Sequence, residues 1–503
     1  MFFDFAPENN TKVIDTYGPQ SADIHALTYD SRNVHDQTAF FCISGDHHDG
    51  HQFIDQAAKN GATVIIGTDQ SILFQSHNNN PDVTYVLVED AKRMMSLVSA
   101  EFYGHVYKRL QSIAVTGTNG KTTVTAFIHQ LLNRCGIRTG SIGTEKVRDD
   151  ESSRSLNHTT HTTPEAPDLH HIFNTFYKEG IEAVALEVTS IAIDQKRVDG
   201  LLFDIGVHTN LTPEHLDFHA SFDQYRQSKL AMFRQVKKAV VNLDDTGMSQ
   251  DILQIFEGEV LTYSLKQEAD ITAQLIDVDE SGTQAEITLL DRRFQVKLPL
   301  FGEHNVSNLL AALAACLLYD VPAEELIEQI SELSMPEGRL NLLETNTDYQ
   351  VISDFAHTPD ALVCVIEAAR SMKPKNLILV VAGTGTRDPT LLPMLTEYAE
   401  GKADHLIVTT EHPDRRDRQD ILAEMMSGFQ RPDQEEIRTT LHREEAIKMA
   451  LSTADEGDIV LLTGLGPLDH QIIHGKEVPY SEIDVIHQCL AELKAGTHSH
   501  ASS

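Results

Sequence analysis

A glycine-rich turn between an apolar run and a helical pattern is the strongest chemical signal in the sequence. The stretch IAVTGTNGKTTVTAFIHQLLNRCG (113–136) places Gly117 and Gly120 just before Lys121 and Thr122. Glycine allows the tight turn in which backbone N–H groups point at phosphate oxygens, and the helix start adds partial positive charge. The lysine can reach the terminal phosphates of a nucleoside triphosphate, and the threonine hydroxyl can hold Mg²⁺. The pattern predicts a nucleotide-binding loop, although the first glycine of the common G-x-x-x-x-G-K-[ST] spacing is missing.

Four residues further along the chain have side chains that could serve a nucleotide-dependent reaction. Glu187 ends an apolar run, and His215 lies in a polar loop. Lys229 lies within a helical pattern, and Asn305 opens a helix. Oxygen ligands such as carboxylates suit Mg²⁺. Taken singly, each residue is equally typical of a solvated loop, a cap or a surface helix, so the set gains meaning only beside the nucleotide-binding loop.

The elements that must position these residues follow two hydrophobic patterns. Apolar strands alternate with helices from about residue 110 and again from about 340, which predicts mainly parallel sheets covered on both faces. Alternation of apolar and polar residues over 270–300 predicts an antiparallel ribbon, followed by a helix over 305–321. The expected strands lie at 39–44, 62–68, 83–90, 113–117, 182–188, 203–210, 238–245, 349–356, 376–383, 405–410 and 458–464.

Length and composition suit a globular α/β protein of three domains. The chain has 503 residues, of which 41% are hydrophobic and 23% charged, and a domain takes roughly 100–200 residues. We predict domains at 1–107, 108–335 and 336–494, and a flexible tail at 495–503. The net charge of −35, from 40 Lys and Arg against 75 Asp and Glu, argues against broad binding to nucleic acid or anionic membranes.

Cysteine usage and the N-terminal sequence point to an intracellular protein. The five cysteines are scattered and form no CxxC pair, which argues against a disulfide framework or a structural zinc site. The first residues lack the basic and then apolar pattern of a signal peptide, and no apolar run approaches the ~20 residues of a membrane helix. We therefore expect a cytoplasmic location.

Blocks spread over nearly the whole chain resemble the Mur ligase family, ATP-dependent enzymes that form amide bonds in peptidoglycan precursors. Their order and spacing are most similar to the branch that adds the third amino acid of the stem peptide. The blocks are YDSR (29–32), HHDGHQFI (47–54), TGTNGKTT (116–123), HTTPE (161–165), LEVTS (186–190), QKRVDG (195–200), FDIGVHTNLTPEHLDFH (203–219), SKLAMF (228–233), NVSN (305–308), GR (338–339), DFAHTPDAL (354–362) and GTRD (385–388). The resemblance implies a UDP-MurNAc-binding domain, a central ATP-binding domain and a Rossmann-like domain that binds the amino acid.

The resemblance also implies a metal site and an ATP site. Residues matching Glu187 and His215 bind Mg²⁺, with Thr122 in the same shell. The residue matching Lys229 is carbamylated by CO₂, which gives it a carboxylate-like ligand for the metal. The expected catalytic residues are Lys121, Glu187, His215 and Lys229. The expected ATP-binding residues are Gly117, Thr118, Asn119, Gly120, Lys121, Thr122, Thr123, Asn305 and Arg339.

A second set matches family residues that hold the UDP-linked substrate. The arginine in the set suits the diphosphate, because its planar fork pairs with two oxygens at once. The hydroxyl residues are typical of turns and caps when taken alone. The set is Ser31, Asp46, His47, His48, Thr162, Thr163, Thr189, Gln195 and Arg197.

The residues expected to read the incoming amino acid depart from the family's pattern. The resemblance places the α-carboxylate of that amino acid on Arg387. The family's next signature is Asp-Asn-Pro followed by a variable residue, and only the proline is retained here. The implied set is Arg387, Glu411, His412, Pro413, Asp414, Gly464 and Asp469.

The fourth position of that signature bears on which amino acid is added. In the family an arginine there accompanies meso-diaminopimelate, because it pairs with the second carboxylate. Asp414 would repel that carboxylate and suits the terminal ammonium of lysine or ornithine. Arg415 and Arg416 follow immediately, and a one-residue shift of the loop would let Arg415 take the arginine's part. The family's Gly-Lys-Gly-His-Glu segment is replaced by TGLGPLDHQ (463–471), in which Asp469 stands in for the missing acid.

The implied reaction transfers the γ-phosphate of ATP to the carboxylate of UDP-MurNAc-L-Ala-D-Glu, and an amine then attacks the acyl phosphate. We predict an ATP- and Mg²⁺-dependent ligase that adds L-lysine, with L-ornithine and meso-diaminopimelate as alternatives. A paralogue that binds the precursor without catalysis is a further alternative, which the set of Lys121, Glu187, His215 and Lys229 argues against. We expect a monomer whose partners are these substrates, with no nucleic acid and no membrane span.

Overall fold

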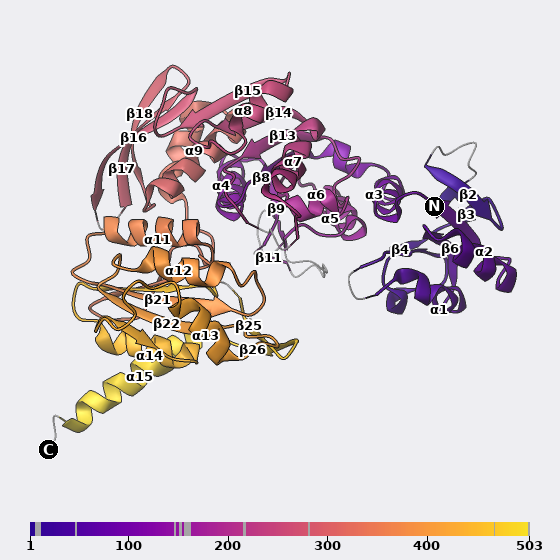
Figure 1. The fold of residues 1–503 in the computed structure, drawn as a ribbon. Coiled ribbons are helices and arrows are strands. Elements are labelled where there is room, and N and C mark those ends of the chain that lie inside the picture. The colour runs from indigo at the N-terminus through magenta and orange to yellow at the C-terminus, as the bar shows by residue number, and fades with distance from the viewer. Residues whose placement is uncertain are drawn as a thin grey trace. The chain divides into compact units, whose positions relative to one another are not determined.

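The computed structural model describes most of the chain, which divides into two compact units (Figure 1). The described residues are 1–5, 12–45, 48–144, 147–149, 153–154, 162–214, 218–279, 282–466 and 468–500, with only the backbone for 153–154 and 495–500. The first compact unit comprises Met1–Ala114, Ile137–Gly206 and Ala231–Lys237. The second comprises Val115–Gly136, Val207–Leu230 and Lys238–Ser503.

The first unit contains short strands and helices in α/β order. Its strands are β1 (Phe2–Asp4), β2 (Val13–Tyr17), β3 (Ser21–Asp23), β4 (Ala26–Thr28), β5 (Thr38–Phe41), β6 (Ala62–Gly67), β7 (Thr84–Val88), β9 (Thr139–Ile142), β10 (Val147–Arg148), β11 (Ser153–Arg154) and β12 (Ala183–Glu187). Its α-helices are α1 (Ile54–Lys59), α2 (Gln70–Asn79), α3 (Ala91–Phe102), α5 (Ala166–Lys178) and α6 (Ser190–Asp194). Four elements contribute residues to both units: β8 (Gln111–Thr116), β13 (Phe203–His208), α7 (Phe222–Met232) and β14 (Val236–Asn242).

The sheet nearest the N-terminus has the strand order β2-β7-β6-β5-β4, with β2 antiparallel and the other pairs parallel. Neighbouring residues of a strand enter different cores: Phe41 packs in the cluster that includes Met94 of α3, and Phe40 packs with Leu73 of α2. Because both faces of the sheet are covered, its strands read as continuous apolar runs. The strands predicted at 39–44, 62–68 and 83–90 are confirmed as β5, β6 and β7.

The second unit contains the helix after the nucleotide loop, an antiparallel ribbon and a second sheet. Its strands are β15 (Glu259–Ser264), β16 (Ile271–Asp279), β17 (Gly282–Leu289), β18 (Arg292–Leu298), β19 (Asn341–Leu343), β20 (Gln350–Asp354), β21 (Leu377–Thr384), β22 (His405–Glu411), β23 (Ile437–Thr439), β24 (Ile459–Thr463), β25 (His470–Ile473) and β26 (Lys476–Pro479). Its helices are α4 (Lys121–Arg134), α8 (Ser249–Ile255), α9 (Glu303–Leu318), α10 (Ala323–Gln329), α11 (Pro359–Ser371), α12 (Leu391–Ala399), α13 (Arg418–Met426), α14 (Arg443–Thr453) and α15 (Glu482–His500). Strands β16, β17 and β18 pair antiparallel, which confirms the predicted ribbon.

The C-terminal sheet has the strand order β19-β20-β24-β21-β22-β23 and is parallel except for β19. Helices α11 and α12 cover one face, and α14 and α15 cover the other (Figure 1). Leu379 belongs to the core on the first side and Val380 to the core on the second. In such a sheet the carboxyl ends of the strands gather at one edge, and the loops there are where ligands bind.

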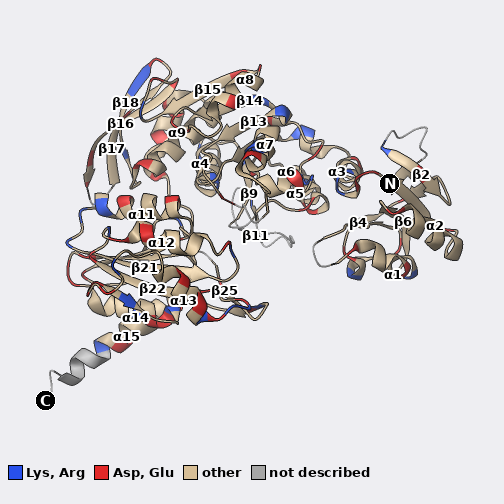
Figure 2. Ribbon diagram, in the orientation of Figure 1, with Lys and Arg blue, Asp and Glu red and all other residues tan. Residues whose placement is uncertain are grey.

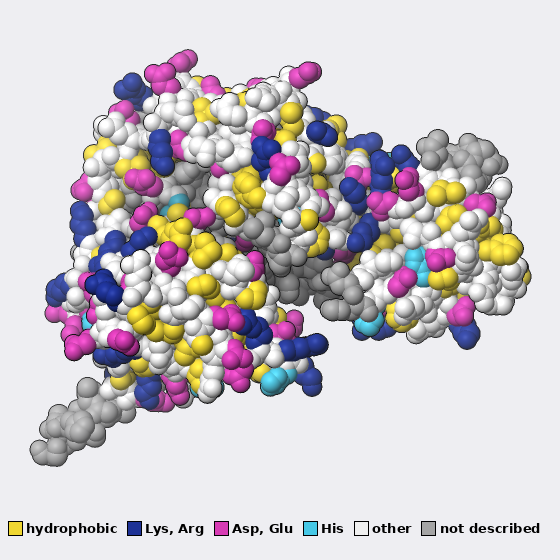
Figure 3. Space-filling view, in the orientation of Figure 1, with side chains coloured by type: hydrophobic (Ala, Val, Ile, Leu, Met, Phe, Trp, Pro, Cys, Tyr) yellow, Lys and Arg dark blue, Asp and Glu magenta, His cyan; other side chains and the backbone are white. Residues whose placement is uncertain are grey.

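Acidic and basic residues are both spread along the chain (Figure 2). On the face shown in Figure 3, acidic and basic side chains are interspersed with hydrophobic ones. No helix within the described residues is long and apolar enough to cross a membrane. The tail predicted at 495–503 falls outside the described residues, apart from the backbone of α15 up to His500.

Candidate active site

The nucleotide loop joins β8 to α4 through two glycines in left-handed backbone conformations. Gly120, at the start of α4, has φ +86°, and a Cβ there would lie 2.4 Å from Asn308 Oδ1 of α9. Any other residue would be strained in this conformation and would meet the α9 side chain. The turn therefore needs glycine for its backbone conformation and for the close approach of α9.

The segment after β13 holds this loop in place. The Thr118 N–H donates to the Asn210 carbonyl (2.8 Å), and the Asn119 N–H donates to Asn210 Oδ1 (2.9 Å). The Thr209 hydroxyl donates to the Asn119 carbonyl at 2.6 Å. The Thr118 hydroxyl and the buried Tyr225 hydroxyl are 2.9 Å apart. These bonds fix the loop shape before any ligand is present.

Two lysine ammonium groups meet at the carbonyls of the same loop. Lys121 Nζ donates to the carbonyls of Gly117 (2.9 Å) and Thr118 (2.7 Å). Lys229 Nζ donates to the Gly117 carbonyl at 2.7 Å and lies 4.8 Å from the centre of the Tyr225 ring. Burial, and next the Lys121 charge, lower the pKa of Lys229 well below its ordinary value, while Glu214 opposes the change. A lysine with so low a pKa is readily deprotonated, and a neutral amine is a nucleophile.

A cavity of about 290 Å³ opens beside the nucleotide loop. The expected ATP residues Asn119, Gly120, Thr122, Thr123, Asn305 and Arg339 line it, together with His304, Asp354, Asp360 and Cys364. Asn305 Nδ2 donates to the Phe301 carbonyl at 2.9 Å, and Arg339 Nη2 lies 3.4 Å from Thr122 Oγ1. The structure thus brings together the nucleotide loop, the start of α9 and Arg339 around one cavity. The lining residues Asp354 and His304 were not among the predicted ones.

In the first unit, Glu187 stands at the end of β12 and is held by Thr144. The Thr144 N–H donates to Glu187 Oε1 (2.8 Å), and its hydroxyl lies 3.3 Å from Oε2. A Cβ on Gly143 would lie 2.1 Å from Glu187 Oε1, so only glycine allows this approach. The Thr163 hydroxyl donates to the Glu187 carbonyl at 2.9 Å. Glu187 is therefore a buried and oriented carboxylate, consistent with an oxygen ligand for a metal.

Several residues expected to hold the UDP-linked substrate form a network around Thr163. Thr163 Oγ1 is 3.4 Å from Thr189 Oγ1, and Arg197 Nη1 donates to the Thr163 carbonyl at 3.0 Å. Arg197 Nε also forms an ion pair with Glu165 Oε1 at 2.7 Å. The Thr162 hydroxyl lies 3.0 Å from that of Thr144. The network places three of the expected hydroxyl groups and one guanidinium together.

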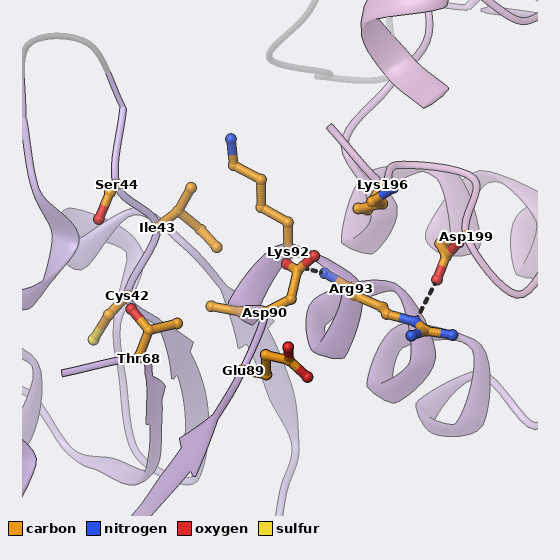
Figure 4. Close-up of a pocket in the computed structure, with 11 residues that line it drawn as sticks. Cys42, Ile43, Ser44, Thr68, Glu89, Asp90, Lys92, Arg93, Lys196 and Asp199 are labelled. Carbon is orange, nitrogen blue, oxygen red and sulfur yellow. Dashed lines mark hydrogen bonds and ion pairs between the residues drawn. The ribbon is translucent and has the colours of Figure 1, made fainter. Parts of the chain in front are cut away.

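A larger cavity of about 740 Å³ adjoins this network (Figure 4). The residues that line it are Cys42, Ile43, Ser44, Thr68, Glu89, Asp90, Ala91, Lys92, Arg93, Lys196 and Asp199. Lys92, in the first turn of α3, donates a hydrogen bond to Gln195 Oε1, whereas Arg93 is paired with Asp199 at 2.9 Å. Sequence reasoning missed Lys92, because its partner Gln195 is 103 positions away. Ser31 is buried and His48 is exposed, and no described contact joins either of them to the Thr163 network.

Most of the residues expected to bind the amino acid lie at or just after the carboxyl ends of strands in the C-terminal sheet. Glu411 ends β22, and a Cβ on Gly464 would lie 2.5 Å from Glu411 Oε1. A Cβ on Gly385 would lie 2.1 Å from the Pro413 carbonyl oxygen. Burial, followed by the nearby charges of His470, Arg387 and Arg443, lowers the pKa of His412 to about 4. His412 is therefore neutral near pH 7.

The loop that follows Glu411 is braced by the β25–β26 ribbon. His412 Nδ1 accepts from the Ile472 N–H at 2.9 Å, and the Asp414 N–H donates to the Ile472 carbonyl at 2.9 Å. Arg416 is paired with Glu424 at 2.6 Å, while Arg415 is exposed. Asp469 is also predicted to contact the amino acid, but 96% of its side chain is exposed and it lies 3.1 Å from His470.

Three predicted site residues lie outside the described part of the chain: Asp46, His47 and His215. Within the described part, no group of three His, Cys, Asp or Glu side chains is placed to hold a metal ion. The carboxylate of Glu187 and the hydroxyl of Thr122 each carry the kind of oxygen atom that Mg²⁺ prefers as a ligand.

Comparisons with known proteins match the chain over most of its length. The matching family models are "Mur ligase family, catalytic domain" over 23–103, "Mur ligase middle domain" over 115–316 and "Mur ligase, glutamate ligase domain" over 338–466. A UDP-N-acetylmuramoyl-L-alanyl-D-glutamate–2,6-diaminopimelate ligase of Caldanaerobacter subterraneus subsp. tengcongensis is 35% identical over 476 residues, covering 94% of this chain and 96% of that one. The Geobacillus kaustophilus ligase of the same name is 35% identical over 480 residues, covering 93% and 95%.

A solved structure shows the same architecture. The structure of a UDP-N-acetylmuramoyl-L-alanyl-D-glutamate–2,6-diaminopimelate ligase is similar with a TM-score of 0.67 and 27% identity, covering 98% of this chain and 100% of that chain. The predicted family and the three-domain α/β fold are therefore confirmed. The chain belongs to the Mur ligase family and is an ATP-dependent acid–amino-acid ligase.

Proposed function

We propose that this ligase adds a diamino acid to UDP-MurNAc-L-Ala-D-Glu in cytoplasmic peptidoglycan precursor synthesis. The observation that carries the proposal is the buried Lys229, whose Nζ lies 2.7 Å from the Gly117 carbonyl of the nucleotide loop. A protein that only binds nucleotide has no need of a desolvated lysine there, since burying an amine without a role is costly. The curated relatives act on the same dipeptide according to their names.

The proposed reaction has two steps. A terminal carboxylate oxygen of the dipeptide attacks the γ-phosphorus of ATP, and ADP leaves. The neutral amine of the diamino acid then attacks the acyl carbon, inorganic phosphate leaves and the amine loses a proton. Lys121 offsets the negative charge that builds on the phosphoryl oxygens, and the backbone of the nucleotide loop orients them.

Lys229 acts as a carbamate in this proposal. Its neutral amine attacks CO₂, forms an N–C bond and releases a proton, which converts a lysine into an anionic oxygen ligand. The lowered pKa of Lys229 favours the neutral amine that this step needs. Thr122, Glu187, His215 and the carbamate would hold Mg²⁺, which supplies charge stabilisation for phosphoryl transfer.

The UDP-linked substrate is held by the predicted set, with Lys92 as an added contact. Lys92 lines the 740 Å³ cavity and bonds to Gln195, one of the predicted residues. A cavity of this size accommodates a ligand as large as a nucleotide. An ammonium at its wall suits the negative charge of a diphosphate.

Two observations bear on which diamino acid is added. The names of the relatives support meso-diaminopimelate as the first candidate. Because Arg416 is paired with Glu424, the exposed Arg415 is the better candidate for the second carboxylate of that substrate. Asp414 favours a second candidate, L-lysine or L-ornithine, whose terminal ammonium it would attract.

The test is phosphate release from ATP with UDP-MurNAc-L-Ala-D-Glu and each of the three amines in turn. Turnover that requires both the dipeptide and one diamino acid is the expected result. Turnover with meso-diaminopimelate supports the first candidate, and turnover with lysine or ornithine alone supports the second. Phosphate release that needs no amine, or none with any amine, would refute the proposed ligase reaction.

A further inference from the structure

A buried ion cluster lies beneath the residues expected to read the amino acid. Arg443, the first residue of α14, is fully buried. Its Nη1 donates to Glu411 Oε2 and to the Thr463 carbonyl, both at 2.9 Å, and its Nε donates to Glu482 Oε2 at 2.5 Å. The Ser353 hydroxyl donates to the other oxygen of Glu482 at 3.0 Å. One guanidinium thus joins the ends of β22 and β24 to the starts of α14 and α15.

The two oxygens of Glu411 are used differently. Oε2 accepts from Arg443, whereas Oε1 faces the Gly464 backbone and accepts no hydrogen bond from the described residues. Gly464 lacks a side chain, so nothing from that residue covers Oε1. One oxygen of this buried carboxylate is therefore anchored by Arg443, and the other has no hydrogen-bond partner among the described residues.

The charges of the cluster do not cancel. Two buried carboxylates, Glu411 and Glu482, share one guanidinium, so the cluster has a net charge of one negative unit when both carboxylates are ionised. A buried excess charge is unfavourable unless an opposite charge joins it. Arg387 lies near enough to affect Glu411, but it is the residue expected to take the α-carboxylate of the amino acid. A substrate ammonium would supply the missing positive charge.

We propose that Arg443 is a positioning residue that holds Glu411 ionised and turned toward the non-reacting ammonium of the incoming diamino acid. The inference rests on the proposed function. It concerns the non-reacting ammonium because the attacking amine must be neutral, and an ionised carboxylate would keep that amine protonated. Lysine, ornithine and meso-diaminopimelate all carry such a second amine.

The groups around Glu411 make the proposal testable by pH. Burial, together with Glu482, raises the pKa of Glu411 to about 7, and Arg443 and Arg387 oppose that rise. Tyr480 also interacts with Glu411. If Glu411 must be ionised, kcat/KM for the diamino acid rises with pH through the pKa of Glu411. Removing the Arg443 charge must move this acid limb to higher pH, and removing the Glu482 charge must move it to lower pH.

The experiment measures kcat/KM for the diamino acid against pH in the full-length ligase and in Arg443→Gln, Arg443→Lys and Glu482→Gln. We expect the acid limb of the kcat/KM profile to move to higher pH by about one unit in Arg443→Gln and to lower pH by about one unit in Glu482→Gln. Arg443→Lys, which keeps the charge, should recover much of the wild-type limb. Lys448→Gln is the matched control, since it removes a cation from the same helix at an exposed ion pair with Glu492.

A purely structural role for Arg443 would lower kcat/KM at all pH values and leave the limb in place. The inference would be overturned if the acid limb of the kcat/KM profile stays in place, or if it moves in the same direction in Arg443→Gln and Glu482→Gln. If Arg443→Gln does not fold, Glu482→Gln decides alone, and an unmoved limb in that variant is enough to reject the proposal. A wild-type protein without amine-dependent turnover would overturn the proposed function and this inference together.

Discussion

The nucleotide loop and the amino-acid loop are built in different ways. The nucleotide loop takes its left-handed conformations at glycines, Gly117 and Gly120. The amino-acid loop takes them at His412 (φ 39°) and Asp414 (φ 52°), where a side chain makes them costly by about 1 kcal/mol or more each. Contacts with Ile472 of the β25–β26 ribbon offset that cost. The first loop takes these conformations at its own glycines and is also braced by Asn210 and Tyr225, whereas the second takes them at non-glycine residues and depends on the ribbon to hold them.

This difference suggests how each of the two loops tolerates amino-acid substitutions. The nucleotide loop presents backbone groups to a ligand that all members of the family share. The amino-acid loop presents side chains, and a ribbon holds them in strained positions. Substitutions in the nucleotide loop should therefore abolish activity, whereas substitutions in the amino-acid loop should mainly change which amine is used.

The largest effect is expected from Lys229→Ala, which removes the amine proposed to become a carbamate. We expect kcat for phosphate release to fall by about 10²–10³-fold, as for other groups that stabilise transition-state charge. Wild-type activity should also depend on dissolved bicarbonate, and the variant should not respond to it. Lys237→Ala is the control, because that lysine pairs with Asp204 on the surface. A variant with near wild-type kcat would exclude a role for Lys229 in the chemistry.

The next test removes single charges from the amino-acid loop, which should alter the specificity for the amine more than the rate of the reaction. If meso-diaminopimelate is the substrate, Arg415→Ala should raise its KM about 10-fold, and Asp414→Asn should lower it by removing a repulsive charge. If lysine or ornithine is the substrate, Asp414→Asn should raise KM about 10-fold and Arg415→Ala should change little. KM for ATP serves as the internal control. Equal effects of both variants on every amine would mean that neither residue reads the side chain.

The same contrast explains what the sequence could and could not predict. Residues 113–136 carry the whole signal for the nucleotide loop, so its strand, glycines and helix were predicted correctly. The strands around it were predicted because each is buried on both faces and reads as an apolar run. Arg443 was not predicted, because its partners Glu411 and Glu482 lie 32 and 39 positions away. No local pattern distinguishes such an arginine from one on a helix surface.

The cavity of about 740 Å³ that Lys92 lines provides a smaller test of a residue that only the fold brings into place. Lys92 was missed for the reason that Arg443 was, since only the fold brings it to Gln195. We expect Lys92→Ala to raise KM for UDP-MurNAc-L-Ala-D-Glu about 10-fold, the usual scale for one charge-assisted contact. KM for ATP and for the diamino acid should not change. Lys59→Ala, at an exposed position of α1, is the matched control. An unchanged KM would remove Lys92 from the substrate site.

The smallest effect is expected from Tyr225→Phe, which tests how the nucleotide loop is braced. The variant loses the hydroxyl that lies 2.9 Å from Thr118 Oγ1 but keeps the ring beneath Lys229. Because Thr118 Oγ1 also donates to the Thr212 carbonyl and accepts from the Thr212 N–H, the loop should keep its shape. We expect the free energy of unfolding to fall by about 1 kcal/mol in urea denaturation, with a KM for ATP within about threefold of wild type. Tyr398→Phe, at a 38% exposed tyrosine, controls for the loss of a hydroxyl. A loss of ATP binding in Tyr225→Phe would mean that this side-chain bond, rather than the backbone contacts with Asn210, sets the loop.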